Sequence, residues 1–301
     1  MHFAKKLKDL MPERNLRFML HEHLGGFEAP RSLRKVHASE LTRPEGFCPR
    51  FYALADTAKV KPKDEWVGAA DVATFQLGRM WQDSIVHWFA DMGRAVGHWK
   101  CLACNQLHEF QKRPMKCTSC GSRAFEPVEV RFESAISGAS CGIDMMVDVG
   151  DPLLLPVEIK SMAKEQFKEL HAPLAEHRLR TALYLRLIDE SEHVWSGLVQ
   201  TRRAKVFYVC KGGYVADPEL GRWGLPDRYS PFKEFEIGRD DAQTDALVAR
   251  AKVVKDFRAG LIGMPTGICS SAMAKRAKAC SLCKLCFSGD HPPGHDWQEA
   301  I

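Results

Sequence analysis

Three ionisable side chains, Asp144, Glu158 and Lys160, have the types and spacing of a metal-dependent nuclease site. Glu158 and Lys160 are two residues apart, so in an extended strand both side chains lie on one face. A hairpin turn expected at 150–152 would bring Asp144 beside Glu158. Two carboxylates and a lysine favour phosphodiester hydrolysis, in which the acids bind Mg²⁺ or Mn²⁺ and the lysine orients the attacking water. The alternative without a function is an ordinary ion pair on a solvated strand edge.

The cysteines form a second chemical pattern. The chain has 301 residues and eleven cysteines, a number that would suggest disulfides in a secreted protein. Its first ten residues lack the apolar core of a signal peptide, and no segment approaches the length of a transmembrane helix. We therefore expect a cytoplasmic protein with no membrane partner, in which clustered cysteines bind metal.

Four of these cysteines have the spacing of a zinc ribbon. Cys101 and Cys104 form one CxxC pair, Cys117 and Cys120 form another, and twelve residues separate the two pairs. Two such knuckles bind one tetrahedral Zn²⁺. The segment is short and polar, with almost no core of its own, so we expect the metal to supply its folding energy.

Basic and aromatic residues are candidate contacts to nucleic acid. The formal net charge is only +5, but basic residues concentrate at 31–35, 202–205 and 275–278, where they would attract phosphates. Trp99, beside the zinc knuckle, is the preferred candidate for stacking on an unpaired base. The expected partner is DNA, as single strands or duplex ends.

Strands and helices around one core must position these groups. A hydrophobic content of 45% supports one substantial core with accessory segments. Apolar residues alternate over 128–136, which predicts a half-buried strand, and a further strand is expected near 205–209. Helical spacing predicts helices within 66–95, after Lys160, and over 240–262. The expected fold class is α/β, a core sheet flanked by helices.

In this order, the motifs resemble the RecB-like branch of the PD-(D/E)XK nuclease superfamily, close to the CRISPR-associated RecB-like and phage iron–sulfur exonucleases. Gly142-Ile-Asp144 matches the family's Gly-x-Asp, and Glu158-Ile-Lys160 matches its Glu-x-Lys. The resemblance implies a restriction-endonuclease-like core. It also implies that Asp144 and Glu158 bind the cation, with the Ile159 carbonyl as a further ligand, and that Lys160 positions or activates the water.

The resemblance assigns residues on two helices. After the lysine the family has Gln-x-x-x-Tyr; this chain has Arg180 in place of the glutamine and keeps Tyr184. The pair would hold the substrate or the lysine. On an upstream helix the family has glycine followed four residues later by His or Glu, and that position is Gln82 here. Gln82 would complete an outer shell, or Asp83 or His87 would take its place.

The resemblance extends to cysteines near both ends of the chain. In many RecB-like nucleases a cysteine before Pro-Arg joins three C-terminal cysteines to hold a [4Fe–4S] cluster. Cys48 matches the first, and Cys280 and Cys286 fit the family's Cys-x5-Cys spacing. Either Cys269 or Cys283 would be the fourth ligand. The alternative is a second zinc site, because four thiolates suit either metal.

These expectations divide the chain into segments. An N-terminal helical and loop segment with the first iron–sulfur cysteine spans 1–65, and the nuclease core spans 66–95 and 126–262. A zinc-ribbon insert spans 96–125, and the C-terminal iron–sulfur segment spans 263–301.

The expected function is that of a Mg²⁺- or Mn²⁺-dependent deoxyribonuclease, an exonuclease on DNA ends or single strands. It would act in recombination, repair or CRISPR adaptation in a bacterial or phage-infected cell, with proteins of those processes as further partners. One alternative is a noncatalytic DNA-binding or assembly factor with a nuclease fold. Another is a sequence-specific endonuclease. The sequence indicates neither oligomeric state nor digestion polarity.

Overall fold

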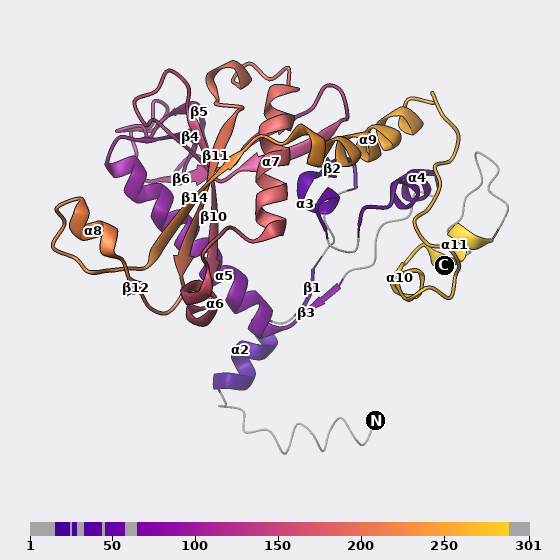
Figure 1. Cartoon of the computed structure of the whole chain (residues 1–301), viewed down its shortest axis with the longest axis horizontal. Helices are drawn as coiled ribbons and strands as arrows, with labels where there is room; N and C mark the ends of the chain where they lie inside the picture. Colours follow the sequence, from indigo (N-terminus) through magenta and orange to yellow (C-terminus); the bar gives the residue numbers. More distant parts are fainter. Residues whose placement is uncertain (1–15, 25, 29–32, 44–45, 58–64, 289–301) are drawn as a thin grey trace.

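The computed structural model describes residues 16–24, 26–28, 33–43, 46–57 and 65–288 (Figure 1). The α-helices are α2 (Leu16–Leu24), α3 (Ala38–Leu41), α4 (Pro49–Thr57), α5 (Ala69–Asp91), α6 (Lys164–Glu169), α7 (Ala175–Asp189), α8 (Pro218–Arg222), α9 (Asp241–Arg258), α10 (Lys275–Ala279) and α11 (Cys283–Phe287), with a 3₁₀ turn η1 (Ser196–Leu198). The strands are β1 (Gly26–Glu28), β2 (Val36–His37), β3 (Glu65–Val67), β4 (Ala95–Cys101), β5 (Leu107–Lys112), β6 (Phe125–Val128), β7 (Val130–Glu133), β8 (Ala139–Ile143), β9 (Met145–Val147), β10 (Leu155–Met162), β11 (Arg203–Cys210), β12 (Val215–Ala216), β13 (Tyr229–Ser230) and β14 (Phe232–Gly238).

A mixed seven-stranded sheet forms the centre of the molecule. Its order is β14-β11-β10-β9-β4-β5, and β6 also pairs with β4. β10 and β11 are parallel, whereas β9 and β10 form an antiparallel hairpin in which Leu155 pairs with Val147. The turn of that hairpin uses Gly150 at φ +92°, a backbone conformation that favours glycine. The expected turn at 150–152 and the expected strand near 205–209 are both confirmed.

A second sheet of three strands, β2-β8-β7, adjoins the first. β8 belongs to this small sheet and β9 to the large one, so the chain passes between sheets at Asp144, the single residue separating them. The single strand expected over 128–136 is wrong. β6 ends at Val128 in the large sheet, and β7 begins at Val130 in the small one.

Helices cover both faces of the large sheet, which confirms the expected α/β class. On one face, Ile85 and Val86 of α5 belong to one apolar cluster with Val157 and Ile159 of β10. On the other face, Ala182 of α7 packs in a cluster with β11. Because side chains alternate along a strand, Glu158 and Lys160 face the α7 side. β10 therefore presents apolar residues to the α5 side and the candidate site residues to the α7 side.

The helix predicted over 240–262 is α9, which ends four residues earlier than expected, at Arg258. Asp240 is its N-cap, and its side chain accepts a hydrogen bond from the backbone N–H of Gln243, as a capping aspartate should. Leu247, Ala251 and Val254 are buried along one face of the helix.

The zinc-ribbon segment is built into the large sheet. β4 pairs with β9 through Ala95 and Val147, while β5 and β6 pair with β4. Trp99 and Phe125 lie in the same apolar cluster as α5. The segment thus adds strands to the sheet and shares its core, which the cysteine spacing alone did not indicate.

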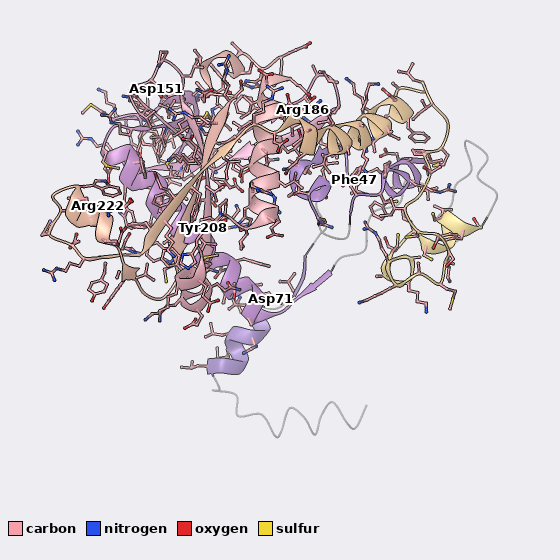
Figure 2. The ribbon with its side chains drawn as sticks, viewed as in Figure 1. Phe47, Asp71, Asp151, Arg186, Tyr208 and Arg222 are labelled. Atoms are coloured by element: carbon pink, nitrogen blue, oxygen red, sulfur yellow. The ribbon has the colours of Figure 1, made fainter. Side chains whose placement is uncertain are left out.

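The cysteine-rich C-terminal helices form a separate group with α4. Leu282 and Leu285 pack against Leu54 and Ala55, and Figure 1 shows α4, α10 and α11 together at the right of the view, away from the large sheet. Figure 2 places Phe47 near this group and Tyr208 in the main body. We call α4, α10, α11 and the cysteines beside them the cysteine lobe. None of the helices in the described ranges is both long and apolar enough to cross a bilayer.

Candidate active site

Asp144 is held at the junction of the two sheets by hydrogen bonds to both of its carboxylate oxygens. The backbone N–H of Ile159 donates to Oδ2 at 2.8 Å. The side-chain amide of Gln82, on α5, donates to Oδ1 at 3.0 Å. Two elements distant in sequence therefore fix one carboxylate beside the middle of β10.

Glu158 and Lys160 lie on the same face of β10 and form an ion pair. The Lys160 Nζ is also 3.9 Å from Asp144 Oδ2, and it donates a hydrogen bond of 3.2 Å to the carbonyl of Ile159. The structure thus brings together the three side chains that the sequence singled out. Their convergence excludes the alternative of an ordinary ion pair on a solvated strand edge.

The three side chains are largely buried, with exposed fractions of 11% for Asp144, 5% for Glu158 and 23% for Lys160. Burial and the neighbouring Glu158 charge raise the pKa of Asp144 well above its ordinary value. Burial alone would lower the pKa of Lys160, but the charges of Glu158 and Asp144 outweigh it and raise that pKa. With both acids ionised, their charge would exceed that of the one lysine, and a divalent cation would favour this ionised state.

The donor set fits a hard divalent cation. Asp144 and Glu158 offer carboxylate oxygens, and the Ile159 carbonyl, which accepts from Lys160 Nζ, adds a neutral oxygen beside the lysine. Mg²⁺ and Mn²⁺ prefer oxygen ligands and are commonly held by one or two carboxylates, with water or substrate completing the shell. The set has no sulfur or imidazole that would favour zinc.

Tyr184 and Arg180 of helix α7 border the site on the face of the sheet that this helix covers. Burial, and next the charges of Glu158 and Asp144, raise the pKa of Tyr184 well above its ordinary value, so its O–H remains a donor. Arg180 donates through Nε to the hydroxyl of Thr42 at 3.3 Å. Its charge acts on both Lys160 and Tyr184. Both predicted residues therefore lie around the acids and the lysine.

Helix α5 contributes Gln82 to the site but not its neighbours. Asp83 is exposed. The ring nitrogens of His87 contact the carbonyl oxygens of Asp83 and Phe125 instead, at 2.7 and 3.4 Å. Gly78 explains how the helix comes so close, because a Cβ there would lie 3.3 Å from the Ser161 hydroxyl. Of the three candidates, only Gln82 reaches Asp144.

The zinc-ribbon cysteines form a group that could hold a metal ion. The sulfurs of Cys101, Cys104, Cys117 and Cys120 all lie within 4.8 Å of one another, and two of the Sγ–Sγ distances are 3.6 Å. Sulfurs around a tetrahedral zinc with bonds of about 2.3 Å are about 3.8 Å apart. The geometry therefore fits one zinc ion.

The remaining clustered cysteines gather in the cysteine lobe. Burial raises the pKa of Cys280, and the nearby thiols of Cys48, Cys286 and Cys283 raise it further. Cys269 and Cys48 act in the same direction on Cys286. Within the described ranges, no three of these sulfurs meet the single-ion geometry of the zinc ribbon.

One expectation about nucleic-acid contacts is wrong. Trp99 is only 1% exposed, and its Nε1–H donates to the Gln111 carbonyl, so it cannot stack on a base. In the 202–205 cluster, Arg203 pairs with Asp151 and Glu236, and Lys205 pairs with Glu234. Arg202 is exposed, and this cluster stays a predicted phosphate contact. Residues 31 and 32 of the first basic cluster lie outside the described residues.

Sequence reasoning missed several groups around the site. Thr181 lines a small hollow with Glu158 and Tyr184, and its buried hydroxyl has no partner among the described residues. Tyr208, which pairs with Lys160 across β10 and β11, hydrogen-bonds His177 at 2.9 Å. His177 has the helical spacing of Arg180 and Tyr184, but nothing local in the sequence connects it to Tyr208.

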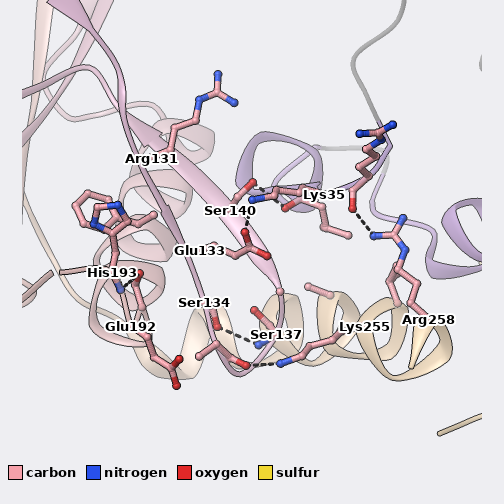
Figure 3. Close-up of a pocket in the computed structure, with 18 residues that line it drawn as sticks. Lys35, Arg131, Glu133, Ser134, Ser137, Ser140, Glu192, His193, Lys255 and Arg258 are labelled. Carbon is pink, nitrogen blue, oxygen red and sulfur yellow. Dashed lines mark hydrogen bonds and ion pairs between the residues drawn. The ribbon is translucent and has the colours of Figure 1, made fainter. Parts of the chain in front are cut away.

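A larger cavity of about 650 Å³ lies between the small sheet and α9 (Figure 3). Its lining contains none of the three converging side chains. Lys35 and Glu133 pair across it, and Lys255 donates to backbone carbonyls of the β7–β8 turn. The candidate site therefore lies outside this cavity.

Comparison with known proteins gives little beyond this geometry. No family model matches the sequence, and no curated protein matches it. Among solved structures, the chain is similar to LHK-Exo in complex with dAMP, with 12% identity and a TM-score of 0.39 over 76% of this chain and 90% of that one. A second, SSO0001, has 12% identity and a TM-score of 0.30 over 92% and 95% of the two chains. Likenesses this remote carry no argument about fold or activity.

Proposed function

We propose that this chain is a Mg²⁺- or Mn²⁺-dependent deoxyribonuclease with a PD-(D/E)XK core of the RecB-like type, acting as an exonuclease on DNA ends or single strands. The observation that carries the proposal is the convergence of Asp144, Glu158 and Lys160 at the junction of the two sheets. A buried acid pair beside a lysine suits an oxygen-bound divalent cation and a phosphate.

Each residue has a role that follows from its contacts. Asp144 and Glu158, with the Ile159 carbonyl, would hold the cation, which supplies a polarised phosphate and a bound water of lowered pKa. Lys160 lies between the two acids, where it would position or activate the attacking water and offset negative charge on the phosphate.

Three further residues would support the substrate and the acids. Gln82 fixes the orientation of Asp144 through its amide. Tyr184 keeps its proton beside the acids and can donate to a phosphate oxygen. Arg180 replaces a neutral amide of the family pattern, and its positive charge on the same side of the site would contact the scissile phosphate.

We further propose a structural Zn²⁺ at Cys101, Cys104, Cys117 and Cys120, and a [4Fe–4S] cluster at Cys48, Cys280, Cys286 and either Cys269 or Cys283. The 3.6 Å sulfur separations support the zinc. Two buried guanidinium nitrogens in the cysteine lobe, Arg50 Nε and Arg276 Nη1, have no partner among the described residues, as expected if an anionic group belongs there. All eleven cysteines are free thiols, which supports a cytoplasmic setting.

The decisive assay incubates purified protein and Mn²⁺ with end-labelled single-stranded and double-stranded DNA. We expect the wild type to release nucleotides and Lys160→Ala to lose at least about a hundredfold in rate, because electrostatic groups at a reacting centre contribute on that order. Lys168→Ala, an exposed lysine on the helix after β10, is the matched control and should keep wild-type activity. Equal rates in the wild type and Lys160→Ala would refute the proposal.

Two rival functions give different outcomes in the same experiment. A noncatalytic DNA-binding or assembly factor would retain the DNA without cleaving it, whether or not Mn²⁺ is present. A sequence-specific endonuclease would cut closed-circular duplex DNA, which has no ends. The exonuclease proposal predicts that circular duplex is resistant and that linear DNA is degraded. Proteins of recombination, repair or CRISPR adaptation are the partners that such an activity would suit.

A further inference from the structure

Two half-buried arginines in the cysteine lobe each have a buried guanidinium nitrogen without a hydrogen-bond partner among the described residues. Arg50, on α4, donates through Nη2 to the carbonyl of Cys286 at 3.2 Å, but its Nε is buried with no partner among the described residues. Arg276, on α10, donates through Nη2 to the carbonyl of Gly46, while its Nη1 is buried and equally unpartnered. Buried guanidinium donors are normally bonded, so an acceptor is missing at each position.

Both arginines lie beside candidate cluster ligands. Arg50 follows Cys48 by two residues, and its positive charge acts on the Cys286 thiol. A Cβ on Gly267 would lie 3.3 Å from Arg50 Cδ and 3.8 Å from Cys286 Sγ, so arginine and sulfur occupy the same small space. Arg276 Nη1 would lie 3.7 Å from a Cβ on Gly46, in the segment that leads into Cys48.

No acidic side chain of the lobe pairs with these arginines. Asp56 of α4 pairs with Arg258 instead, and the chain from Lys275 to Phe287 contains no Asp or Glu. The basic residues of that stretch are Lys275, Arg276, Lys278 and Lys284. Buried guanidinium nitrogens without a protein anion suit a bound anionic group.

We propose that Arg50 and Arg276 donate hydrogen bonds to the sulfur atoms of the iron–sulfur cluster and stabilise its reduced state. This inference rests on the cluster proposed above. A [4Fe–4S] core with four thiolates carries net negative charge, and one-electron reduction adds another negative charge. Donors and positive charge next to the sulfurs favour the more negative state and so raise the reduction potential. The arginines are positioning residues for the cluster and do not belong to the nuclease site.

The test compares Arg50→Gln and Arg276→Gln with wild-type protein, all purified anaerobically. Iron content and visible absorbance establish that the cluster is assembled, and zinc content with circular dichroism establishes that the chain is folded. The reduction potential is then measured by a dithionite titration followed by EPR, so the electron comes from dithionite. Lys278→Gln, an exposed residue on the same helix as Arg276, removes one charge without reaching the lobe interior.

We expect each Arg→Gln variant to disfavour the reduced cluster by about tenfold or more, which is about 59 mV towards negative potential for a one-electron couple. Lys278→Gln should shift the potential by less than half as much, because exposed charge is screened by solvent. If an Arg→Gln variant holds no iron, its potential cannot be compared, and the corresponding Arg→Lys variant takes its place in the test.

Arg50→Lys and Arg276→Lys keep the charge but lose the planar fork of donors. Their potentials should fall between those of the wild type and the glutamine variants, and they serve as the test if a glutamine variant does not fold. Unchanged potentials in iron-loaded variants would overturn this inference alone. Wild-type protein that contains no iron would overturn the cluster assignment and this inference with it, whereas the nuclease assay is judged separately at Lys160.

Discussion

Gln82 is a neutral residue at a position where an acid would add negative charge to the candidate site. Its neutral amide donates to Asp144 Oδ1 at a position where the RecB-like pattern has His or Glu. A carboxylate there would add a third acid to a buried pair. Compared with an acid at this position, Gln82 therefore lowers the affinity for the metal but makes the metal-free protein more stable, because like charges repel when no cation lies between them.

Gln82→Glu should bind Mn²⁺ about tenfold more tightly, since each added anionic ligand strengthens a hard-cation site. Without metal it should unfold more easily, by about 1–2 kcal/mol, because the amide donor is lost and the acids repel. Mn²⁺ titration by EPR and thermal unfolding with and without Mn²⁺ measure the two effects. Gln76→Glu, exposed on the same helix, should change neither. An unaltered Mn²⁺ affinity in Gln82→Glu would show that Gln82 does not face the cation.

His177 provides a pH-dependent contribution to stability. Burial, and next the charges of Lys160 and Arg180, lower its pKa from 6.5 to about 4. Between these two values the unfolded chain binds a proton that the folded chain does not, so the free energy of unfolding falls as the pH drops from 6.5 towards 4. The loss should be about 2 kcal/mol after allowance for solvent screening.

Substituting His177→Gln should flatten that dependence while leaving the stability at pH 7 within about 1 kcal/mol of the wild type. Urea unfolding at a series of pH values between 4 and 7 measures the slope. His171→Gln, at an exposed position, is the control and should keep the wild-type slope. If the slope in His177→Gln equals that of the wild type, another group is responsible for the acid lability.

Single residues were predictable where the relation between them is local. Glu158 and Lys160 could be placed on one face because strand geometry alternates with a period of two. Tyr184 and Gln82 required the family resemblance, because nothing in their own helices marks them. Thr42, which accepts from Arg180, was not predictable, since the contact joins segments far apart in the chain.

At the scale of elements, the zinc ribbon and α5 form one unit. His87 of α5 contacts the Phe125 carbonyl and packs edge-on against Trp99. Phe125 pairs in turn with Cys101, a proposed zinc ligand. Since α5 also carries Gln82, the ribbon should help to hold the helix against Asp144.

Removal of zinc should therefore loosen α5. We expect amide hydrogen exchange over the second half of α5 to accelerate by about tenfold or more after chelation, which corresponds to about 1.4 kcal/mol of local stability. Cys117→Ser, which removes a buried ligand, should have the same effect without a chelator. Exchange in α7, on the other face of the sheet, is the internal reference. Equal exchange in α5 with and without zinc would mean that the ribbon does not support the helix.

The sequence predicted individual helices and strands better than it predicted which strands pair with one another. The β9–β10 hairpin, β11 and α9 follow from turn residues and apolar spacing, which are local properties. The break at Glu129 and the change of sheet at Asp144 did not follow, because both depend on which strands pair. For the same reason, the zinc-binding segment could be recognised by its cysteines but not placed as an extension of the central sheet.

For the molecule as a whole, the two cysteine groups lie in separate apolar clusters. Cys101 and Cys117 pack with the central sheet, whereas Cys280 and Cys286 pack with α4. The sequence predicted that Cys48 and the C-terminal cysteines meet, and the structure brings them together. It did not predict that they meet in a lobe beside the sheet, because spacing carries no information on where two chain ends pack.

The two metals should therefore be lost independently. Cys48→Ala should lose iron and keep zinc, and Cys101→Ala should lose zinc and keep iron. Elemental analysis of anaerobically purified protein measures both contents. Cys269→Ala and Cys283→Ala, compared in the same way, identify the fourth ligand as the one whose loss removes iron. Loss of both metals in either of the first two variants would show that the groups depend on each other.

The central claim is that Asp144 and Glu158 share a divalent cation next to Lys160. A crystal structure of the protein with Mn²⁺, measured near the manganese absorption edge, tests it most directly. We predict an anomalous peak within bonding distance of both carboxylates, at about 2.0–2.3 Å from their nearest oxygens, and its absence in an Asp144→Asn crystal. A well-ordered site with no peak, or manganese bound only elsewhere in the molecule, would contradict the proposed nuclease centre.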